Sequence, residues 1–447
     1  MAEKLKKTKE KRINNLELLA PAGNLNKLKT ALAYEADAVY LGIPDFSLRV
    51  RINDFNLKTL KEAALYAHKQ KKKVYVTINI FAHNEHLKKL PNYLKALRDV
   101  KVDALIISDP GVIALAKKYL PRVEIHLSTQ ANCTNLESAR FWASQGIKRI
   151  ILGREVTLKE IIEIKKALPK VDLEYFVHGA MCMAYSGRCF LSKLFVNRSA
   201  NLGDCAQPCR WEFDVSRYTL KAERHEAELE LVEEKHGSYL LNSSDLNLLK
   251  QLPDLIKAGI TSFKIEGRAK SDYYLATVCA IYRRALNLIE NKTKKEVLVK
   301  ELNHLYQELE TKLIHRGYTT GFLLGEKASQ NIKDAKNESA WEYCGQVIKI
   351  ENLKDTKRIY FKVHNTIKTS DNLEIILKNY DIIKLHPKYF LEEKDARIKE
   401  EKIFEAHGGG GAKVLVLELS NKELKNKEIF PLAVLRRLKG SDEKRKK

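Results

Sequence analysis

Four cysteines lie close together in the middle of this chain, and no other stretch of the sequence is as rich in them. Cys182, Cys189, Cys205 and Cys209 follow the pattern C-x6-C-x15-C-x3-C, although the 447 residues include only seven cysteines. Thiolates that meet at one point can form disulfides, bind zinc or hold an iron–sulfur cluster. Free cysteines are also often buried as small apolar side chains, which need not meet. The density of thiols favours a shared centre.

The N-terminal residues of the chain and the spacing of the four cysteines distinguish between these alternatives. The first residues of the chain, MAEKLKKTKEKR, are charged and contain no apolar core, so we expect no export signal, a cytoplasmic protein and reduced thiols. Structural zinc usually takes pairs of the form C-x2–4-C, and only Cys205 and Cys209 fit that form. An iron–sulfur cluster accepts more varied spacings. The pattern therefore favours a cluster, most simply [4Fe–4S], while zinc and simple burial remain alternatives.

Charged residues near this segment could bind an anion or take part in catalysis. The candidates are Arg154, Lys264 and Arg268 as ligands of an anion that carries carboxylate or phosphate groups, and His178, Glu155 and Glu266 as catalytic residues. Guanidinium groups suit the first role because they pair with carboxylate and phosphate through two parallel hydrogen bonds. The alternative for each residue is an ion pair or a helix cap, and for His178 the packing of a core histidine.

Eight short apolar runs surround these residues in the sequence. They are Leu16–Gly23, Ala38–Gly42, Lys73–Asn79, Ala104–Asp109, Glu124–Gln130, Arg149–Arg154, Leu173–His178 and Ser262–Gly267. Most are followed by a segment with helical periodicity. Eight strands that alternate with helices over about 270 residues are typical of a TIM-type (β/α)8 barrel. An open doubly wound sheet is the alternative.

A barrel would bring the candidate residues to one end of the fold. Active sites of TIM-type barrels lie where the strands end, and Cys182 follows the seventh strand directly. Further polar residues, among them Asn79 and Gln130, end other strands of the set. The insertion at about residues 181–242 should then be a functional loop over the barrel mouth, because structureless loops of that length are uncommon in compact domains.

The last hundred residues change character. Short alternating runs, Gly345–Ile350, Arg358–Val363, Leu373–Leu377 and Lys413–Leu419, are separated by turn residues. They predict a small β-barrel domain over residues 340–437, after a TIM-type barrel domain over residues 15–325. The two ends, residues 1–14 and 438–447, are basic, and we expect them to be disordered, solvated tails.

The balance of charge points to a polyanionic partner. The chain contains 80 Lys and Arg residues against 57 Asp and Glu residues, which gives a net charge of +23. Such a field favours nucleic acid, because each neutralised phosphate releases counterions; a generally lysine-rich proteome is the alternative. No run of about 18 apolar residues is present, so we expect no membrane span.

The segment around the first two cysteines resembles the signature of a known family. Residues 174–192, EYFVHGAMCMAYSGRCFLS, are similar to the signature of the collagenase-like peptidases, the "unclassified" peptidase family numbered 32. Many characterised members of that family are RNA or ubiquinone hydroxylases with a four-cysteine iron–sulfur cluster. The chain length and the motif GDCAQPCRW are most similar to the branch that hydroxylates the wobble uridine of tRNA with prephenate as cosubstrate.

One departure from the family pattern bears on the fourth ligand. Some relatives have a cluster cysteine in a segment like Asn242–Asn247, and this chain has none there. The resemblance therefore implies that Cys209 completes the ligand set, with tRNA as the partner and an electron donor or paralogous partner still to be identified.

Three functions are compatible with these features. The first is hydroxylation of tRNA, which would form 5-hydroxyuridine. The second is proteolysis, as the family name suggests, but the chain has no G-x-S-x-G motif, and His83-Asn-Glu-His86 is not H-E-x-x-H. A dyad of Cys182 and His178 would leave the other cysteines of the group unexplained. The third is a non-catalytic iron–sulfur protein that binds RNA.

Overall fold

The computed structural model describes most of the chain. The described residues are 16–43, 46–48, 54–182, 184–185, 188–202, 204–211, 242–325, 329–331, 337, 339–395, 397–408, 413–424 and 427–439. The expected N-terminal tail, residues 1–14, lies outside the described residues, as do residues 440–447 of the expected C-terminal tail 438–447 and the middle of the expected insertion, residues 212–241.

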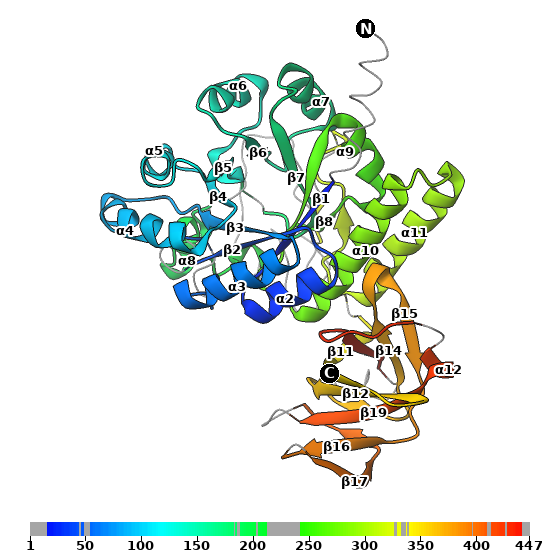
Figure 1. Ribbon diagram of the computed structural model, residues 1–447. Helices are drawn as coiled ribbons and strands as arrows, with labels where there is room; N and C mark the ends of the chain where they lie inside the picture. Colours follow the sequence, from blue (N-terminus) through cyan, green and yellow to red (C-terminus); the bar gives the residue numbers. More distant parts are fainter. Residues whose placement is uncertain are drawn as a thin grey trace, which may run out of the picture.

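A closed barrel of eight parallel strands forms the larger part of the structure (Figure 1). Its strands are β1 (Glu17–Pro21), β2 (Ala38–Gly42), β3 (Lys73–Ile78), β4 (Ala104–Ile107), β5 (Glu124–Leu127), β6 (Arg149–Ile151), β7 (Asp172–Gly179) and β9 (Ile260–Ile265). Strand β9 closes the barrel, because it pairs in parallel with both β1 and β7. The eight strands coincide with the eight apolar runs, so the prediction of a TIM-type barrel is confirmed.

Helices cover the outside of the barrel. They are α2 (Leu25–Ala33), α3 (Leu57–Lys69), α4 (Asn84–Val100), α5 (Pro110–Tyr119), α6 (Leu136–Ser144), α7 (Leu158–Ala167), α9 (Leu252–Ala258), α10 (Asp272–Glu290) and α11 (Lys295–Lys312). Several begin at a side chain that accepts a hydrogen bond from the first turn, as Asn24, Asp109 and Thr157 do. Such caps pair amide groups that a helix start leaves free, and they fix where each loop at the barrel mouth ends.

Two short strands extend the barrel sheet beside β7. Strand β8 (Asp245–Asn247) pairs antiparallel with the end of β7, and β10 (Tyr318–Thr319) runs parallel to β8. The sequence did not predict either strand, because each has only two or three residues and no detectable alternation. Together they cover the end of β7, the strand that leads into the cysteine segment.

A buried ion network fills the interior of the barrel. Arg149 pairs with Glu17, and its Nη1 lies 3.3 Å from Glu174 Oε2. Lys264 Nζ lies 2.8 Å from the other oxygen of Glu174, and Tyr75 donates a hydrogen bond of 2.6 Å to Glu17. Burial alone would raise the pKa of Glu17, but Arg149 outweighs it, so that this pKa is lowered. A buried charge is costly unless it is paired, and here each charge has a partner.

The C-terminal part is an antiparallel sheet that curves into a half-barrel (Figure 1). Its strands are β11 (Trp341–Asn352), β12 (Thr356–Val363), β14 (Asn372–Ile376), β15 (Ile382–Leu385), β16 (Phe390–Lys394), β17 (Arg397–Ile403), β19 (Val414–Ser420) and β20 (Val434–Leu438), in the order β15-β14-β20-β11-β12-β19-β16-β17. The separate pair β13 (Ile367–Lys368) and β18 (Glu405–Ala406) and the short α12 (Asn421–Leu424) complete it. The expectation of a small C-terminal β domain is confirmed.

Buried polar contacts join the half-barrel to the TIM-type barrel. Tyr34, at the end of α2, donates a hydrogen bond of 2.7 Å to the Ile376 carbonyl and accepts one of 2.8 Å from the Val434 amide. Arg436 of β20 lies 3.3 Å from Glu308 of α11 and is itself fully buried. The two parts are therefore packed against each other through specific partners.

Replacement of Arg149 by Met should destabilise the barrel, because Glu17 and Glu174 would stay buried without their shared cation. We expect the free energy of unfolding to fall by about 3–5 kcal/mol, measured by urea denaturation. Arg140→Met is the matched control, since it removes an exposed ion pair with Glu137 that contributes about 0.5 kcal/mol or less. Equal stability of Arg149→Met and the wild type would contradict the role of the network.

Candidate active site

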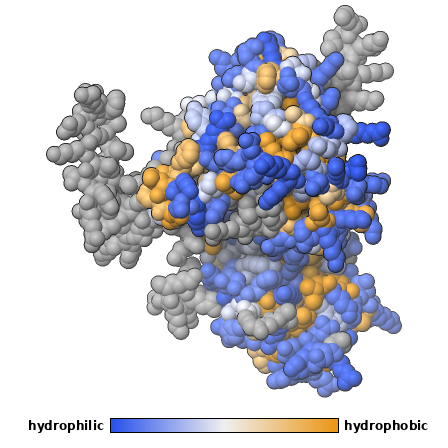
Figure 2. Space-filling model, turned by 90° about the vertical axis from the view of Figure 1, so that its left-hand side faces the viewer, coloured by the Kyte–Doolittle hydropathy of each residue, from blue (hydrophilic) through white to orange (hydrophobic). Residues whose placement is uncertain are grey.

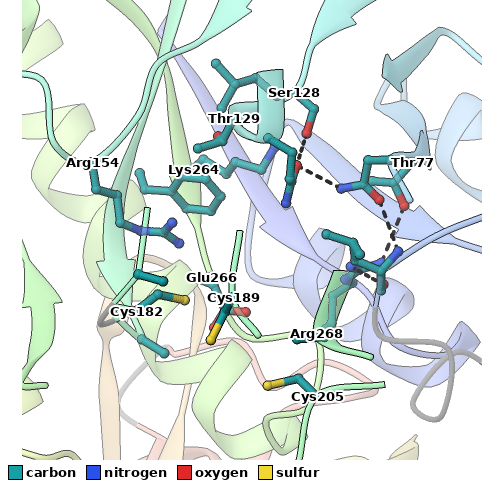
Figure 3. A pocket seen from close by; sticks show the side chains of 18 of the residues that line it. Thr77, Ser128, Thr129, Arg154, Cys182, Cys189, Cys205, Lys264, Glu266 and Arg268 are labelled. Atoms are coloured by element: carbon teal, nitrogen blue, oxygen red, sulfur yellow. Dashed lines mark hydrogen bonds between the residues drawn. The ribbon is translucent and has the colours of Figure 1, made fainter. Parts of the chain in front are cut away.

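A cavity of about 170 Å³ lies at the end of the barrel where the strands terminate. Tyr40, Thr77, Ile106, Ile151, Phe176 and Lys264 line it from six different strands, and the segment after β7 contributes four cysteines. Figure 3 shows the side chains of Thr77, Lys264, Cys182, Cys189 and Cys205 around this cavity. This is the end at which TIM-type barrels carry their active sites.

All four candidate metal ligands line this cavity. Cys182 follows β7, Cys189 precedes the short helix α8 (Leu191–Val196), and Cys205 and Cys209 come after that helix. Cys182 is exposed and the other three are partly buried. The structure thus brings all four thiols of this segment to one cavity, whereas Cys133, Cys279 and Cys344 are buried elsewhere.

The thiols are close enough to influence one another. Cys205 Sγ accepts hydrogen bonds from the Gln207 amide at 3.4 Å and from Ser192 Oγ at 3.6 Å. Burial raises the pKa of Cys209, and the thiols of Cys182 and Cys205 raise it further. Within the described residues, no three Cys, His, Asp or Glu side chains stand at distances that ligate one metal ion. The donor set suits a thiolate-bound centre, and the four sulfur atoms would have to lie closer together to bind it.

Hydrogen bonds dock the cysteine segment on the barrel rim. The Phe81 amide, beyond β3, donates to the Asn201 carbonyl at 3.2 Å, and the side chain of Asn201 accepts a hydrogen bond of 3.1 Å from the Cys189 amide. Arg188 donates a hydrogen bond of 3.3 Å to the Gln130 carbonyl, beyond β5. The barrel therefore sets the position of the thiols.

Three cations alternate with two aromatic rings along another wall of the cavity. Arg154 stacks on Phe176, with its guanidinium carbon 3.8 Å from the ring centroid. Lys264 Nζ lies 5.3 Å from that centroid and 4.4 Å from the ring centroid of Tyr40. The guanidinium carbon of Arg268 lies 5.9 Å from the ring centroid of Tyr40. Cation–π contacts of this kind contribute about 0.5–2 kcal/mol each. The three candidate anion ligands are thus held together, as Figure 3 shows, and they form a wall that attracts anions.

Contacts from behind the wall hold two of these cations in place. Arg268 donates a hydrogen bond of 2.8 Å to Ser47 Oγ and another to the Leu48 carbonyl. Lys264 is 3% exposed; burial lowers its pKa, although the ion pair with Glu174 opposes this effect. Because the side chains are already ordered, an anionic ligand would lose little affinity to their reorganisation.

Glu266 is the candidate catalytic residue that lines the cavity. Its backbone carbonyl accepts a hydrogen bond of 2.8 Å from Tyr274. It is also packed closely against Gly179 at the end of β7, where an added Cβ would lie 2.6 Å from that carbonyl oxygen. Gly179 has a φ of +111°, which other residues rarely adopt. This glycine therefore lets the end of β7 approach the backbone that carries Glu266.

The structure places His178, another candidate catalytic residue, outside the cavity. The side chain is 2% exposed, does not line the cavity, and packs among the rings of Tyr274, Tyr282 and Tyr318 at 5.5–5.8 Å between centroids. Strand alternation alone would place His178 on the same face as Phe176. An irregularity between these two residues in the pairing of β7 with β9 breaks that alternation, and His178 has the packing role of a core histidine.

Glu155 also lies outside the cavity. It follows Arg154 directly, and both residues lie in a turn in which the Val156 amide donates a hydrogen bond of 3.2 Å to the Gly153 carbonyl. The carbonyl groups on either side of Glu155, those of Arg154 and Val156, accept hydrogen bonds from Tyr175 at 3.1 and 2.9 Å. These hydrogen bonds hold the backbone of the turn, from which Arg154 lines the cavity and Glu155 does not.

Several cavity residues were not assigned a role from the sequence. Tyr40 and Phe176 separate the cations, and Asn79, Ser128 and Gln130 form a neutral polar wall. The two aromatic residues could have been found from the alternation of side chains along a strand. Phe176 lies two residues after Glu174 and so shares its face of β7, and Tyr40 lies at the corresponding level of β2. No comparable sequence pattern identifies the neutral polar wall, because the positions of its side chains depend on hydrogen bonds between separate loops.

The segment in which some relatives carry a cysteine contributes a buried ion pair here. Arg316 Nε donates a hydrogen bond of 3.1 Å to Asp245 Oδ1, and both side chains are at least nine-tenths buried. Burial alone would raise the pKa of Asp245, but Arg316 outweighs it and the pKa is lowered. The positive charge of Arg316 also favours the thiolate form of Cys209, so this pair borders the group of thiols.

Comparison with known families identifies the barrel. The sequence model of Peptidase family U32 matches residues 23–333, a region that contains most of the barrel, the four cysteines and the three cations of the cavity.

Individual relatives are named for different activities. The tRNA hydroxylation protein P of Helicobacter pylori is 43% identical over 343 residues, which cover 75% of this chain and 79% of that protein. The 23S rRNA 5-hydroxycytidine synthase of Escherichia coli is 34% identical over 367 residues, or 82% of this chain and 53% of that protein. The collagenase of Porphyromonas gingivalis is 32% identical over 329 residues, or 71% and 76%.

The burial of His178 should make the stability of the barrel depend on pH. Burial lowers the pKa of His178 from 6.5 to about 3, so the unfolded chain takes up this proton first as the pH falls. The stability from this site is complete above about pH 6.5 and is lost progressively toward pH 3. His178→Phe should therefore weaken the loss of stability between pH 6.5 and 4.5, measured by urea unfolding.

The exposed His83 gives the control for this prediction. His83→Phe should keep the pH dependence of the wild type. If His178→Phe and the wild type lose stability at the same rate as the pH falls, His178 is not the buried neutral group that the structure describes.

Proposed function

The chain belongs to Peptidase family U32, and on that premise we propose that it is a tRNA-modifying enzyme that hydroxylates carbon 5 of the wobble uridine, with prephenate as cosubstrate. One observation carries the proposal: four thiols and three cations line a single cavity at the mouth of the barrel. The relatives named for tRNA and rRNA hydroxylation support RNA as the substrate.

The four cysteines would hold an iron–sulfur cluster, which we propose to be of the [4Fe–4S] type. When bound, such a cluster supplies electrons or a Lewis-acidic iron at the barrel mouth. The support is the donor set itself, since thiolates are the usual ligands of these clusters. The hydrogen bonds from Gln207 and Ser192 to Cys205 Sγ are of the kind that tune a cluster through its sulfur ligands.

The cationic wall would bind the cosubstrate. Arg154 and Arg268 would each hold a carboxylate of a small dicarboxylate such as prephenate, and Lys264 between them would add positive charge. Phe176 and Tyr40 would exclude water from the same ligand. Glu266, which lines the same cavity, would act as a general base toward the bound ligands.

The charge of the chain suits an RNA substrate. The net charge of +23 favours a polyanion, and the face of the molecule shown in Figure 2 is mainly hydrophilic. A wobble base belongs to a single-stranded loop, so it can turn out and enter a cavity. No helix among the described residues is long and apolar enough to cross a membrane. We expect the protein to act on tRNA in the cytoplasm with an electron donor or paralogous partner.

Proteolysis is the second candidate, because of the family name and the Porphyromonas gingivalis relative. A cysteine peptidase needs a thiolate with a histidine in hydrogen-bond reach. His178, the histidine nearest to Cys182 in the sequence, faces Tyr282 rather than the cavity. Within the described residues this dyad is not formed, and tRNA hydroxylation is the better supported function.

Loss of the cluster ligands should abolish tRNA hydroxylation. In a strain that lacks this protein, 5-hydroxyuridine-type nucleosides should disappear from digested tRNA, measured by mass spectrometry. Wild-type protein should restore them and Cys182→Ala should not, because one of four ligands is removed. Cys279→Ala, which changes a buried cysteine of α10, is the matched control and should restore them.

An unchanged nucleoside profile in the deletion strain would refute the proposal. It would favour a non-catalytic iron–sulfur protein that binds RNA. Cleavage of denatured collagen by the purified protein, lost in Cys182→Ala, would instead support proteolysis.

Removal of one cation should weaken cosubstrate binding. Arg154→Gln should raise the KM for prephenate roughly 10- to 100-fold, because a charge-assisted hydrogen bond contributes about 1.5–3 kcal/mol. Arg154→Lys should recover only part of the loss, since it lacks the planar fork. Arg140→Gln, on the exposed side of α6, is the control. An unchanged KM in Arg154→Gln would show that the cosubstrate binds elsewhere.

A further inference from the structure

A chain of hydrogen bonds on the neutral wall of the cavity fixes the orientation of an amide group. The Leu48 backbone amide donates to Asn79 Oδ1 at 3.1 Å, and this identifies the oxygen of Asn79 because a backbone N–H can only donate. Asn79 Nδ2 is then a donor, and it donates to Gln130 Oε1 at 3.2 Å. Ser128 Oγ donates to the same oxygen.

The side chain of Gln130 therefore offers a donor to the cavity. Its oxygen already accepts two hydrogen bonds, and a flipped amide would bring its NH₂ group against that of Asn79. Gln130 lines the cavity and is only partly buried. Within the described part of the chain, no hydrogen bond engages Nε2, while the oxygen and the backbone carbonyl are both engaged. The neighbouring Thr129, 5% exposed, also lines the cavity, and its hydroxyl has no hydrogen-bond partner there.

The backbone of Gln130 is held as firmly as its side chain. Gln130 lies in the short 3₁₀ turn η2 (Thr129–Ala131), directly after β5. Its carbonyl accepts the hydrogen bond from Arg188, the residue before Cys189. The donor of Gln130 is thus tied both to the barrel, through Asn79, and to the segment that carries the thiols.

We propose that Gln130 forms a subsite for the carbonyl edge of uracil, an inference that rests on the proposed function and makes it more specific. Uracil carries a carbonyl oxygen at position 4, where cytosine carries an amino group. The oxygen of Gln130 already accepts two hydrogen bonds, so its NH₂ group is the part that can contact a base. This NH₂ group can donate to O4 of uracil, whereas it would face another donor at N4 of cytosine. Gln130 is therefore a specificity residue that distinguishes the two pyrimidines, a choice that matters in a family with a 5-hydroxycytidine synthase among its members.

The division of charge within the cavity separates this subsite from the cosubstrate site. Carboxylates are drawn to Arg154 and Arg268, because charge-assisted hydrogen bonds are about twice as strong as neutral ones. A neutral amide donor is better suited to a neutral carbonyl oxygen. The two ligands can then lie side by side, the base against the neutral wall and the dicarboxylate against the cations.

A binding experiment tests this inference without requiring turnover. The probes are two labelled anticodon stem-loop RNAs that differ only in uridine or cytidine at the wobble position, titrated with the purified full-length protein. The wild type should bind the uridine loop at least about tenfold more tightly, since one correctly paired base contact discriminates by about 1–3 kcal/mol. Gln130→Glu replaces the donor by an acceptor and should abolish or invert this preference.

Matched variants separate the effect from charge and from misfolding. Gln70→Glu adds the same charge on the exposed end of α3 and should keep the preference for uridine. Gln130→Met removes the donor without adding charge and should bring the two affinities within about threefold, with an unchanged circular dichroism spectrum. Equal affinities in the wild type, or a wild-type preference in both Gln130 variants, would overturn the proposal.

The proposed hydroxylation of tRNA and the proposed role of Gln130 can be refuted separately. If the deletion strain loses its hydroxylated nucleosides but the wild type shows no preference between the loops, the proposed function stands and the role of Gln130 falls. If the nucleosides are unchanged but the preference is present and depends on Gln130, the subsite stands as a base-binding site and the proposed reaction falls.

Discussion

The ion pair between Lys264 and Glu174 is the contact on which the cavity depends. A lysine that is 3% exposed can keep its charge only next to a carboxylate, and Glu174 Oε1 lies 2.8 Å from its Nζ. Through Glu174 the lysine is joined to Arg149 and Glu17, so that β1, β6, β7 and β9 share one set of buried charges. The pair also places Lys264 between Tyr40 and Phe176, and the positions of the flanking arginines follow from these rings.

The cavity combines two parts of different origin. The barrel supplies the cations, the aromatic rings and the neutral amides, all at strand ends, where a closed sheet leaves little freedom. The segment after β7 supplies the thiols and is docked on the rim through Asn201 and Arg188. A metal centre, an anionic cosubstrate and a base could therefore meet above one set of strands, which is the arrangement that the proposed hydroxylation requires.

Much of this arrangement could be predicted from the sequence. The eight strands follow from apolar runs, and the shared location of the cysteines and of Arg154, Lys264 and Arg268 follows from their places at strand ends. The position of His178 could not be predicted from strand alternation, because an irregularity in the pairing of β7 with β9 interrupts that alternation. The orientation of Gln130 could not be predicted, since it is set by hydrogen bonds from Asn79, which follows another strand, and from Ser128 at the start of its own turn.

The central claim is that the four thiols share one inorganic centre above the cationic wall. Crystals grown without oxygen from purified protein, with diffraction measured on both sides of the iron absorption edge, test it most directly. The account predicts an iron signal within bonding distance of the sulfur atoms of Cys182, Cys189, Cys205 and Cys209. A signal for zinc alone, or four separate thiols with no metal between them in protein that retains tRNA hydroxylation, would contradict it.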